Sequence, residues 1–182
     1  MREIALHLLD IVENSISAQA KMIIIRVEED HTADRLHISI EDDGRGMDAE
    51  MVAKVADPFV TSRTTRKVGL GIPLLKAAAE ACEGGLDIQS ELGKGTCVTV
   101  TFKLSHIDRM PLGHLASTLL ILLVGTPEVH WLFHYRVDDQ IFSFDDQPVK
   151  ETLEGIPLSD PLVLGYLREL LQDGIAGLNG TA

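Results

Sequence analysis

The sequence predicts an α+β fold, a two-layer sandwich in which helices cover one face of a mixed β-sheet. Two observations lead to this prediction. Segments with helical or strand-like spacing of apolar residues follow one another through residues 4–104, in the order helix, two strands, helix, loop, helix, two strands. The chain also has 182 residues, of which 45% are hydrophobic, so it is long enough to bury a core between two layers.

The first predicted elements are a helix and a hairpin. Apolar residues recur at helical spacing over residues 4–20, which predicts an amphipathic helix. Residues 22–28 and 36–41 are rich in isoleucine and valine, which predicts two strands joined by a polar turn. A short helix is expected over residues 48–55. Residues 57–67, rich in Thr, Ser and Arg, have the composition of a mobile lid.

The next helix is predicted over residues 72–82. Pro73 suits its first turn, because no amide donor is needed there. Segments rich in β-branched residues at 86–91 and 96–104 predict two further strands, joined by a glycine turn. We therefore expect residues 1–105 to form one domain.

The remaining residues, 106–182, are predicted to form a small α/β appendage of unknown role. Its predicted elements are a helix at 112–124, strands at 129–137 and 140–144, and a helix at 161–172. No chemical motif is evident in this part of the chain.

Composition excludes several classes of protein. The formal net charge of −12 argues against nucleic-acid binding, which needs clustered Lys and Arg. Cys82 and Cys97 form no metal or disulfide motif, and the histidines show no metal-ligand spacing. The longest apolar run, residues 119–124, is too short to cross a membrane. We expect a cytoplasmic protein with no membrane segment.

Two glycine-containing turns suggest a nucleotide pocket. Asp42 follows a predicted strand, where its carboxylate can accept a hydrogen bond from the exocyclic amine of adenine. Gly44 and Gly46 would let the backbone pass close under the base. Gly69 and Gly71 precede a helix whose free amides suit phosphate. Each turn has an ordinary alternative: a tight surface turn for the first, and a flexible helix entry for the second.

Asp10 and Asn14 lie four residues apart on the first predicted helix, so their side chains share one face. The Asn14 amide oxygen suits Mg²⁺, which takes few protein ligands. Asp10 could deprotonate a hydroxyl or water. Each residue taken alone is more commonly just a solvated side chain.

Further candidates lie in the predicted lid and at the last strand. Arg63, Arg66 and Lys67 could neutralise charge on a γ-phosphate, although loop cations are mostly solvated. Thr96 could hydrogen-bond near adenine or an adjoining water, although it could equally be an ordinary strand start.

Taken in order, these motifs resemble those of the gyrase, chaperone, histidine kinase and mismatch-repair ATPase superfamily, which shares the Bergerat ATP-binding fold. The resemblance covers residues 4–104. The motifs resemble, in chain order, the N box at 9–15, the first glycine box at 42–46, the phenylalanine box at 57–62, the second glycine box at 69–72, and the closing strand turn of histidine kinases at 90–96.

The resemblance implies that Asn14 holds Mg²⁺, that Asp42 binds adenine, and that Gly44, Gly46, Gly69 and Gly71 shape the pocket and lid. The same motifs add Met47, Phe59, Arg63, Lys67, Leu70 and Thr96 to the expected ATP site. In the ATPase and serine-kinase branches, a carboxylate four residues before the asparagine is the general base. Asp10 occupies that position, although the family more commonly has the longer Glu.

The leading hypothesis is a stand-alone, ATP- and Mg²⁺-dependent protein kinase of the anti-sigma type, which phosphorylates a protein partner in trans. The N box begins within ten residues of Met1, so we expect no upstream dimerisation helices or phosphoacceptor histidine. Nor does the region beyond residue 105 show a sign of a transducer domain. The alternatives are an ATPase whose lid moves a partner and a non-catalytic ATP-dependent binding module. Each of these hypotheses allows a homodimer.

Overall fold

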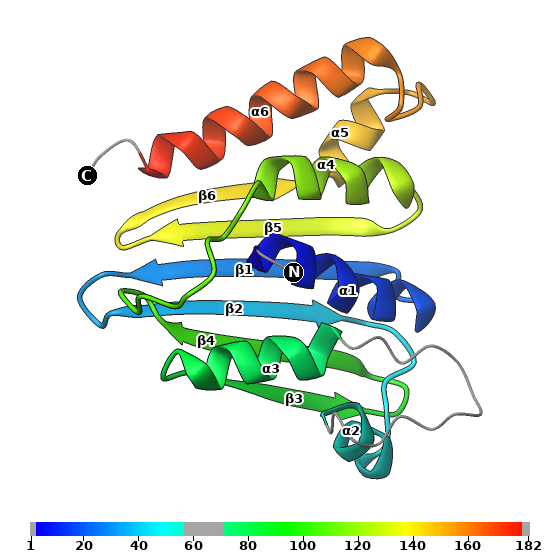
Figure 1. The fold of residues 1–182 in the computed structure, drawn as a ribbon. Coiled ribbons are helices and arrows are strands. Elements are labelled where there is room, and N and C mark those ends of the chain that lie inside the picture. The colour runs from blue at the N-terminus through cyan, green and yellow to red at the C-terminus, as the bar shows by residue number, and fades with distance from the viewer. Residues whose placement is uncertain (1–2, 57–70, 180–182) are drawn as a thin grey trace.

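The computed structural model of the protein describes residues 3–56 and 71–179. Its centre is a six-stranded mixed sheet in the order β3-β4-β2-β1-β5-β6 (Figure 1). The strands are β1 (Met22–Asp30), β2 (Arg35–Asp42), β3 (Gly85–Glu91), β4 (Gly95–Lys103), β5 (His130–Val137) and β6 (Gln140–Asp145). Neighbouring strands are antiparallel, except for the parallel pair β1 and β5.

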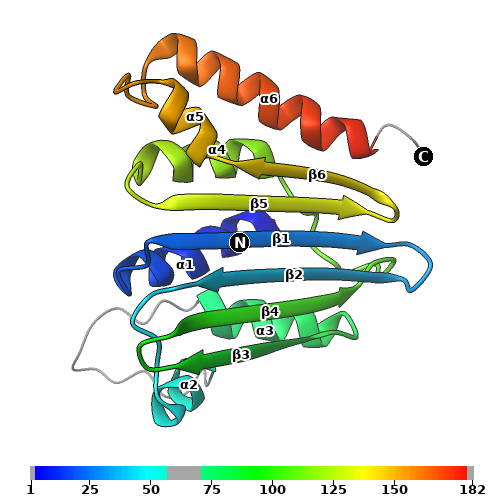
Figure 2. The same cartoon turned by 180° about the vertical axis from the view of Figure 1, so that it is seen from behind.

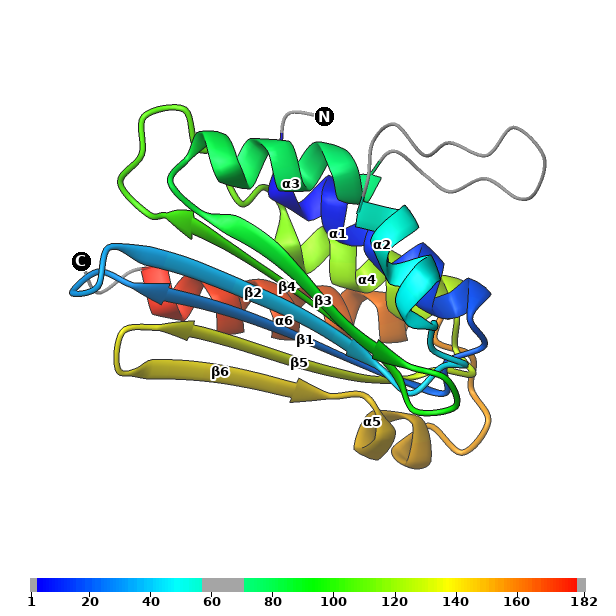
Figure 3. The ribbon, with the colours of Figure 1, turned by 90° about the horizontal axis from the view of Figure 1, so that it is seen from below.

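The helices lie mainly on one side of this sheet. They are α1 (Ile4–Ser17), α2 (Ala49–Ala56), α3 (Gly71–Ala81), α4 (Leu115–Gly125), α5 (Gln147–Thr152) and α6 (Pro161–Asn179). Figure 2 shows the strands from the face opposite α1, α3 and α4, and Figure 3 shows these three helices together on one side. The predicted two-layer α+β architecture is confirmed.

Apolar and polar side chains largely alternate along β1, which explains why the helices cover one face of the sheet. Ile23, Ile25 and Val27 of β1 are buried in the core, whereas Arg26 and Glu28 on the other face are half-buried and form ion pairs. Ile24 also lies on that second face but is buried. This period of two is typical of a sheet with one apolar and one solvated face. The core therefore lies between the sheet and the helices.

Residues 106–179 extend the sheet rather than lying apart from it. Every residue of β1 from Met22 to Glu29 pairs in parallel with β5, beginning with His130. Trp131, Phe133 and Tyr135 of β5 are at most 2% exposed and join the same core as β1 and β2. The division of the chain near residue 105 stays a prediction, but the two parts share one sheet and one core.

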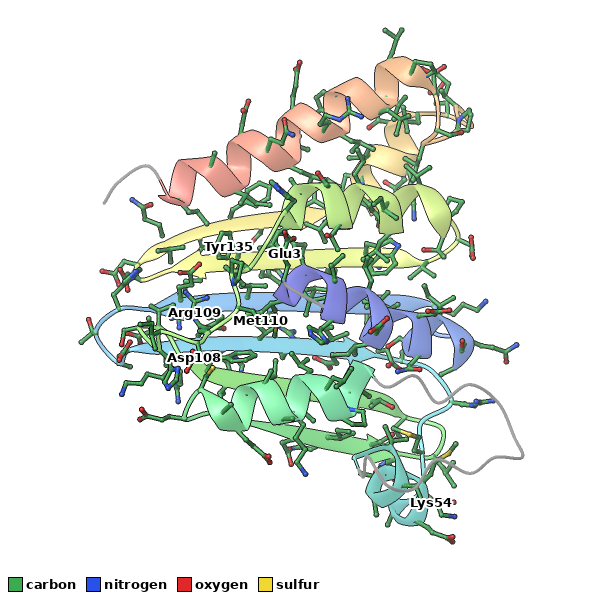
Figure 4. The ribbon with its side chains drawn as sticks, viewed as in Figure 1. Glu3, Lys54, Asp108, Arg109, Met110 and Tyr135 are labelled. Carbon is green, nitrogen blue, oxygen red and sulfur yellow. The ribbon has the colours of Figure 1, made fainter. Side chains whose placement is uncertain are left out.

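The linker between β4 and α4 also contacts α1. The amides of Ile4 and Ala5 donate to the carbonyls of Pro111 and Leu112, at N···O distances of 3.0 and 2.9 Å. These are amides of the first turn, which have no partner within a helix. Figure 4 shows Glu3 at the start of α1 and Met110 in the passing linker. The linker thus provides hydrogen-bond acceptors for first-turn amides of α1, the helix that bears Asp10 and Asn14.

Most predicted elements match the observed ones to within a few residues at their ends. Helix α5 was not predicted, and α6 continues past residue 172 to Asn179. No helix among the described residues is long and apolar enough to cross a bilayer.

Candidate functional site

Asp42 is the last residue of β2 and its side chain is fixed from two sides. The Ser15 hydroxyl on α1 donates to Asp42 Oδ2 at 2.6 Å, and the Gly44 amide donates to Oδ1 at 2.9 Å. The residue is 8% exposed. Because a carboxylate has about four lone-pair sites, it keeps acceptor capacity for a further donor such as the adenine amine.

The glycines of the turn after Asp42 allow a close approach to the protein's own backbone. At Gly46 φ is +66°, and a Cβ there would lie 2.0 Å from the carbonyl oxygen of Glu91. A Cβ at Gly44 would lie 2.9 Å from the carbonyl oxygen of Ala18. The close approach is therefore to the protein's own backbone, which holds this turn against β3 and the end of α1. Their role beside a bound base stays a prediction.

Met47 and Thr96 meet at Ser90, the first residue of the predicted closing strand turn, to which the sequence assigned no role in the site. The Met47 amide donates to Ser90 Oγ at 2.8 Å, and Ser90 Oγ lies 2.8 Å from Thr96 Oγ1. Thr96 also stands opposite Asp42 in the β2–β4 register. A hollow of about 300 Å³ at this end of the sheet is lined in part by Asp42, Ser90 and Thr96.

A second group of predicted residues gathers between α1 and α3. Asp10 is half-buried and Asn14 exposed, one turn apart on α1. A side chain at Gly71, the first described residue of α3, would place its Cβ 2.6 Å from Asp10 Oδ2. The absence of a side chain at Gly71 is what allows the start of α3 to lie directly against the Asp10 carboxylate.

Ser15 joins the two groups, because it follows Asn14 on α1 and bonds to Asp42. Asp10 and Asn14 therefore lie on the same helix as Ser15, which orients Asp42, the residue predicted to bind adenine. A sequence signal for Ser15 exists: it falls four residues after Ile11 on the buried stripe of α1. A polar residue at such a position needs a buried partner.

His7 is a further residue near this contact, outside the sequence motifs. It lies on α1 three residues before Asp10 and is 3% exposed, and its Nδ1 atom has no hydrogen-bond partner among the described residues. Burial lowers the pKa of the His7 imidazole, and the Asp10 carboxylate and the Gly71 backbone oppose this shift.

Six predicted site residues lie outside the described ranges. They are Phe59, Arg63, Arg66, Lys67, Gly69 and Leu70. Of the other predicted site residues, Asp42, Gly44, Gly46, Met47 and Thr96 gather at the end of the sheet, and Asp10, Asn14 and Gly71 gather at the α1–α3 contact.

Away from this region, the hairpin of β5 and β6 brings His130 together with Asp145 and Asp146, with one potential ligand atom of each residue within 4.8 Å of the others. Sequence spacing did not reveal this grouping. Lys150 Nζ lies 2.6 Å from Asp146 Oδ2, and His130 Nε2 lies 2.8 Å from Asp145 Oδ1. Because an ammonium already neutralises the buried carboxylate, we interpret the group as an ion-pair cluster.

Residues 2–106 match the family model described as histidine kinase-, DNA gyrase B-, and HSP90-like ATPase. The chain belongs to this family. The match includes every residue of the two groups described above, so ATP is the expected ligand of this ATPase-like domain.

The curated relatives include several sensor kinases. The chain is 39% identical over 96 residues to the sensor protein kinase FleS of Pseudomonas aeruginosa, a match that covers 53% of this chain and 24% of that protein. It is 31% identical over 96 residues to sporulation kinase C of Bacillus subtilis, covering 53% of this chain and 22% of the relative. The chain therefore spans about a quarter of the length of these relatives.

Among solved structures, the fold resembles the ADP-complexed ATPase domain of Aquifex aeolicus MutL, with a TM-score of 0.52 and 16% identity, over 94% of this chain and 69% of that one. The N-terminal domain of a DNA repair protein gives a TM-score of 0.56 and 13% identity over 97% of this chain and 59% of that one. The likeness in fold thus includes β5 and β6, which lie beyond the sequence motifs.

Proposed function

We propose that the protein is an ATP- and Mg²⁺-dependent protein kinase that phosphorylates a hydroxyl group on a separate protein. One observation carries this proposal: the Asp10 carboxylate lies directly against Gly71, at the start of α3. Amides in the first turn of a helix are free to bind phosphate, and the helix dipole favours the negative charge. A carboxylate beside them is suited to accept the proton of an attacking group.

In the proposed reaction, a substrate hydroxyl attacks the γ-phosphorus of ATP while Asp10 accepts its proton. The new bond joins the hydroxyl oxygen to phosphorus, and the bond to the β-phosphate oxygen breaks to release ADP. Asp42 would fix the adenine through its amine, while Ser15 holds the carboxylate in place. Each of these roles requires only positioning and charge, which are the main sources of catalysis in phosphoryl transfer.

Asn14 is suited to be a ligand of Mg²⁺. Its side chain is exposed, it lies one turn after Asp10 on α1, and it offers a neutral amide oxygen. The ion would neutralise charge on the phosphates.

The relatives' names favour a kinase, since several of them are called kinases. Phosphorylation in trans is part of the proposal, as are a cytoplasmic location and a protein partner.

An ATPase is the second candidate. Asp10 is half-buried, so solvent reaches the residue that would act as base. The same carboxylate could accept a proton from water in place of a hydroxyl. The two activities differ in whether the γ-phosphate goes to a partner or is released.

Incubation of the purified protein with γ-labelled ATP and the products of neighbouring genes distinguishes these candidates. We expect acid-stable label on one partner, whereas free phosphate alone would favour the ATPase. Replacing Asp10 with Asn should lower the turnover rate by about 10²–10⁴-fold, because it removes the general base. Glu13→Gln is the matched control, since Glu13 is an exposed acid on the same helix. Unchanged turnover in Asp10→Asn would contradict the assignment of the base.

A further inference from the structure

The two edges of the sheet differ in how they are protected. At one edge, β3 packs against α2 and exposes the acidic side chains of Asp87 and Glu91. Charged side chains and covering helices keep an edge strand from pairing with another chain. At the other edge, β6 has no Lys, Arg or Pro, and it pairs with β5 residue for residue, without a bulge (Figure 1). The β6 edge therefore lacks the protection that β3 has.

Backbone groups of β6 point away from the sheet at every second residue. The Asp146 amide donates to the Trp131 carbonyl at 3.2 Å, so the even-numbered residues of β6 bond to β5. The odd-numbered residues direct their N–H and C=O groups outward. They are Ile141, Ser143 and Asp145, and all three are exposed, Ile141 to 65%. Within residues 3–56 and 71–179, these outward backbone groups have no hydrogen-bond partner.

Acidic residues stand at both ends of this edge. Asp138 and Asp139 form the turn before β6, and Asp145 ends the strand. If two copies of the chain paired antiparallel about Ser143, the turn of each copy would lie beside Asp145 of the other. Like charges in neighbouring strands are destabilising, and each copy has a formal net charge of −12. A second copy is therefore disfavoured, whereas a segment with basic ends matches the charges at both ends.

We propose that the β6 edge binds an extended segment of a partner protein, with apolar residues at the centre of the segment and Lys or Arg at its ends. The segment would add a further strand to the sheet, and its backbone would bond to the outward groups of β6. An apolar side chain opposite Ile141 would remove its exposed surface from water. The basic ends would face Asp139 and Asp145. This docking site lies at the opposite edge of the sheet from β3 and does not depend on the proposed kinase activity.

Two synthetic peptides and the full-length protein provide the test. The first peptide is Lys-Lys-Val-Thr-Val-Thr-Val-Lys-Lys, and the second has Glu in place of every Lys. Amide hydrogen exchange followed by NMR reports on the outward groups of β6. With the basic peptide at about ten times its Kd, exchange of the Ser143 amide should slow about tenfold, and the amides of β3 should keep their rates. The acidic peptide should bind at least about tenfold more weakly.

Two pairs of variants separate the backbone contribution from the charge. Ser143→Pro removes an outward N–H that does not bond to β5, so the sheet can keep its pairing. It should weaken binding of the basic peptide at least about tenfold, whereas Ser143→Ala keeps the amide and should bind like the wild type. Asp139→Lys should weaken the basic peptide and strengthen the acidic one. Asp87→Lys makes the same change of charge on β3 and should leave both affinities unchanged.

Several results would overturn the inference. They are no binding of the basic peptide, equal binding of both peptides, unchanged affinities in Asp139→Lys, or slowed exchange on β3 in place of β6. Wild-type affinity in a folded Ser143→Pro variant would do the same. A protein that dimerises without peptide and thereby protects the Ser143 amide would show that the occupant is a second copy. Labelling of a partner from γ-labelled ATP tests the kinase proposal separately, and the peptide measurements do not depend on its result.

Discussion

Residues 3–105 and residues 106–179 contribute to one sheet in different ways. The first region carries every residue that was predicted to bind ATP or act on it. The second carries none, yet β5 pairs with β1 along eight residues, from Met22↔His130 to Glu29↔Val137. Its linker also accepts hydrogen bonds from the first turn of α1.

The difference shows that a region without motifs can still determine the geometry of a site. Asp10, Asn14 and Ser15 all lie on α1, and α1 packs between α3 and α4, one from each region. A site residue keeps its position only if its supporting element keeps its own. Changes in the second region should therefore weaken ATP binding in the first.

The largest effect should come from the core of the second region. Phe133 is 1% exposed and stands opposite Ile25 in the sheet. Phe133→Ala should lower the free energy of unfolding by about 3–5 kcal/mol, because it leaves a cavity between β5 and the helices. Chemical denaturation followed by circular dichroism measures this loss.

Trp131 is the only tryptophan and lies on β5 opposite Ile23 of β1, so its fluorescence reports on the second region where it joins the first. If the two regions unfold together, its transition should coincide with that seen by circular dichroism. Two separate unfolding transitions would contradict cooperative unfolding of the two regions and favour independent domains. Ile141→Ala is the control, since an exposed side chain should change stability by no more than about 0.5 kcal/mol.

Asp42→Asn tests the first region directly. The amide replaces one carboxylate oxygen with a donor, so a charge-assisted hydrogen bond from adenine is lost. ATP affinity should fall by about 1.5–3 kcal/mol, or roughly ten- to a hundredfold. Titration calorimetry measures the affinity, and circular dichroism at the same temperature checks that the variant is folded. Undiminished affinity would remove Asp42 from the site.

Ser15→Ala should have a smaller effect on the same site. It removes the hydroxyl that lies 2.6 Å from Asp42 Oδ2, in a buried setting. Stability should fall by about 1–2 kcal/mol, because the carboxylate loses a buried partner, and ATP should bind several-fold more weakly. Ser17→Ala, an exposed position on the same helix, serves as the control. Equal affinities for the two variants would show that Ser15 does not orient Asp42.

The smallest effect concerns pH. Burial lowers the pKa of His7 below its ordinary value of 6.5, so the unfolded chain takes up a proton more readily than the folded protein. Stability from this group is therefore fully present above pH 6.5 and is lost as the pH falls below it. Unfolding free energies measured between pH 8 and pH 5 should fall more steeply for the wild type than for His7→Gln. Parallel pH profiles would contradict this.

Local patterns predicted much of the fold. The period of two in β1 and β2 and the helical spacing in α1 and α3 follow from which side chains must face a core. The motifs likewise placed Asp42 at a strand end and Gly71 at the start of α3. The glycine turn before Thr96 was predicted as a hairpin, and β3 and β4 are paired as expected.

The rest depended on contacts between distant segments. Local sequence assigned neither Ser90 nor His7 a role in the site, because the partners of both side chains are set by packing. Helix α5 was missed because its six residues give too short a pattern. The pairing of β5 with β1 was also not predicted, since parallel pairing joins residues more than one hundred positions apart, such as Met22 and His130.

The sequence by itself determined the family, the order of the motifs and the chemical type of each site residue, because these depend on residue identity and local spacing. The tertiary structure decided that Ser15 holds Asp42, that Gly71 lies against Asp10, and that the motif-free region completes the sheet. Those facts depend on how helices and strands pack across the core, and local sequence does not specify such contacts.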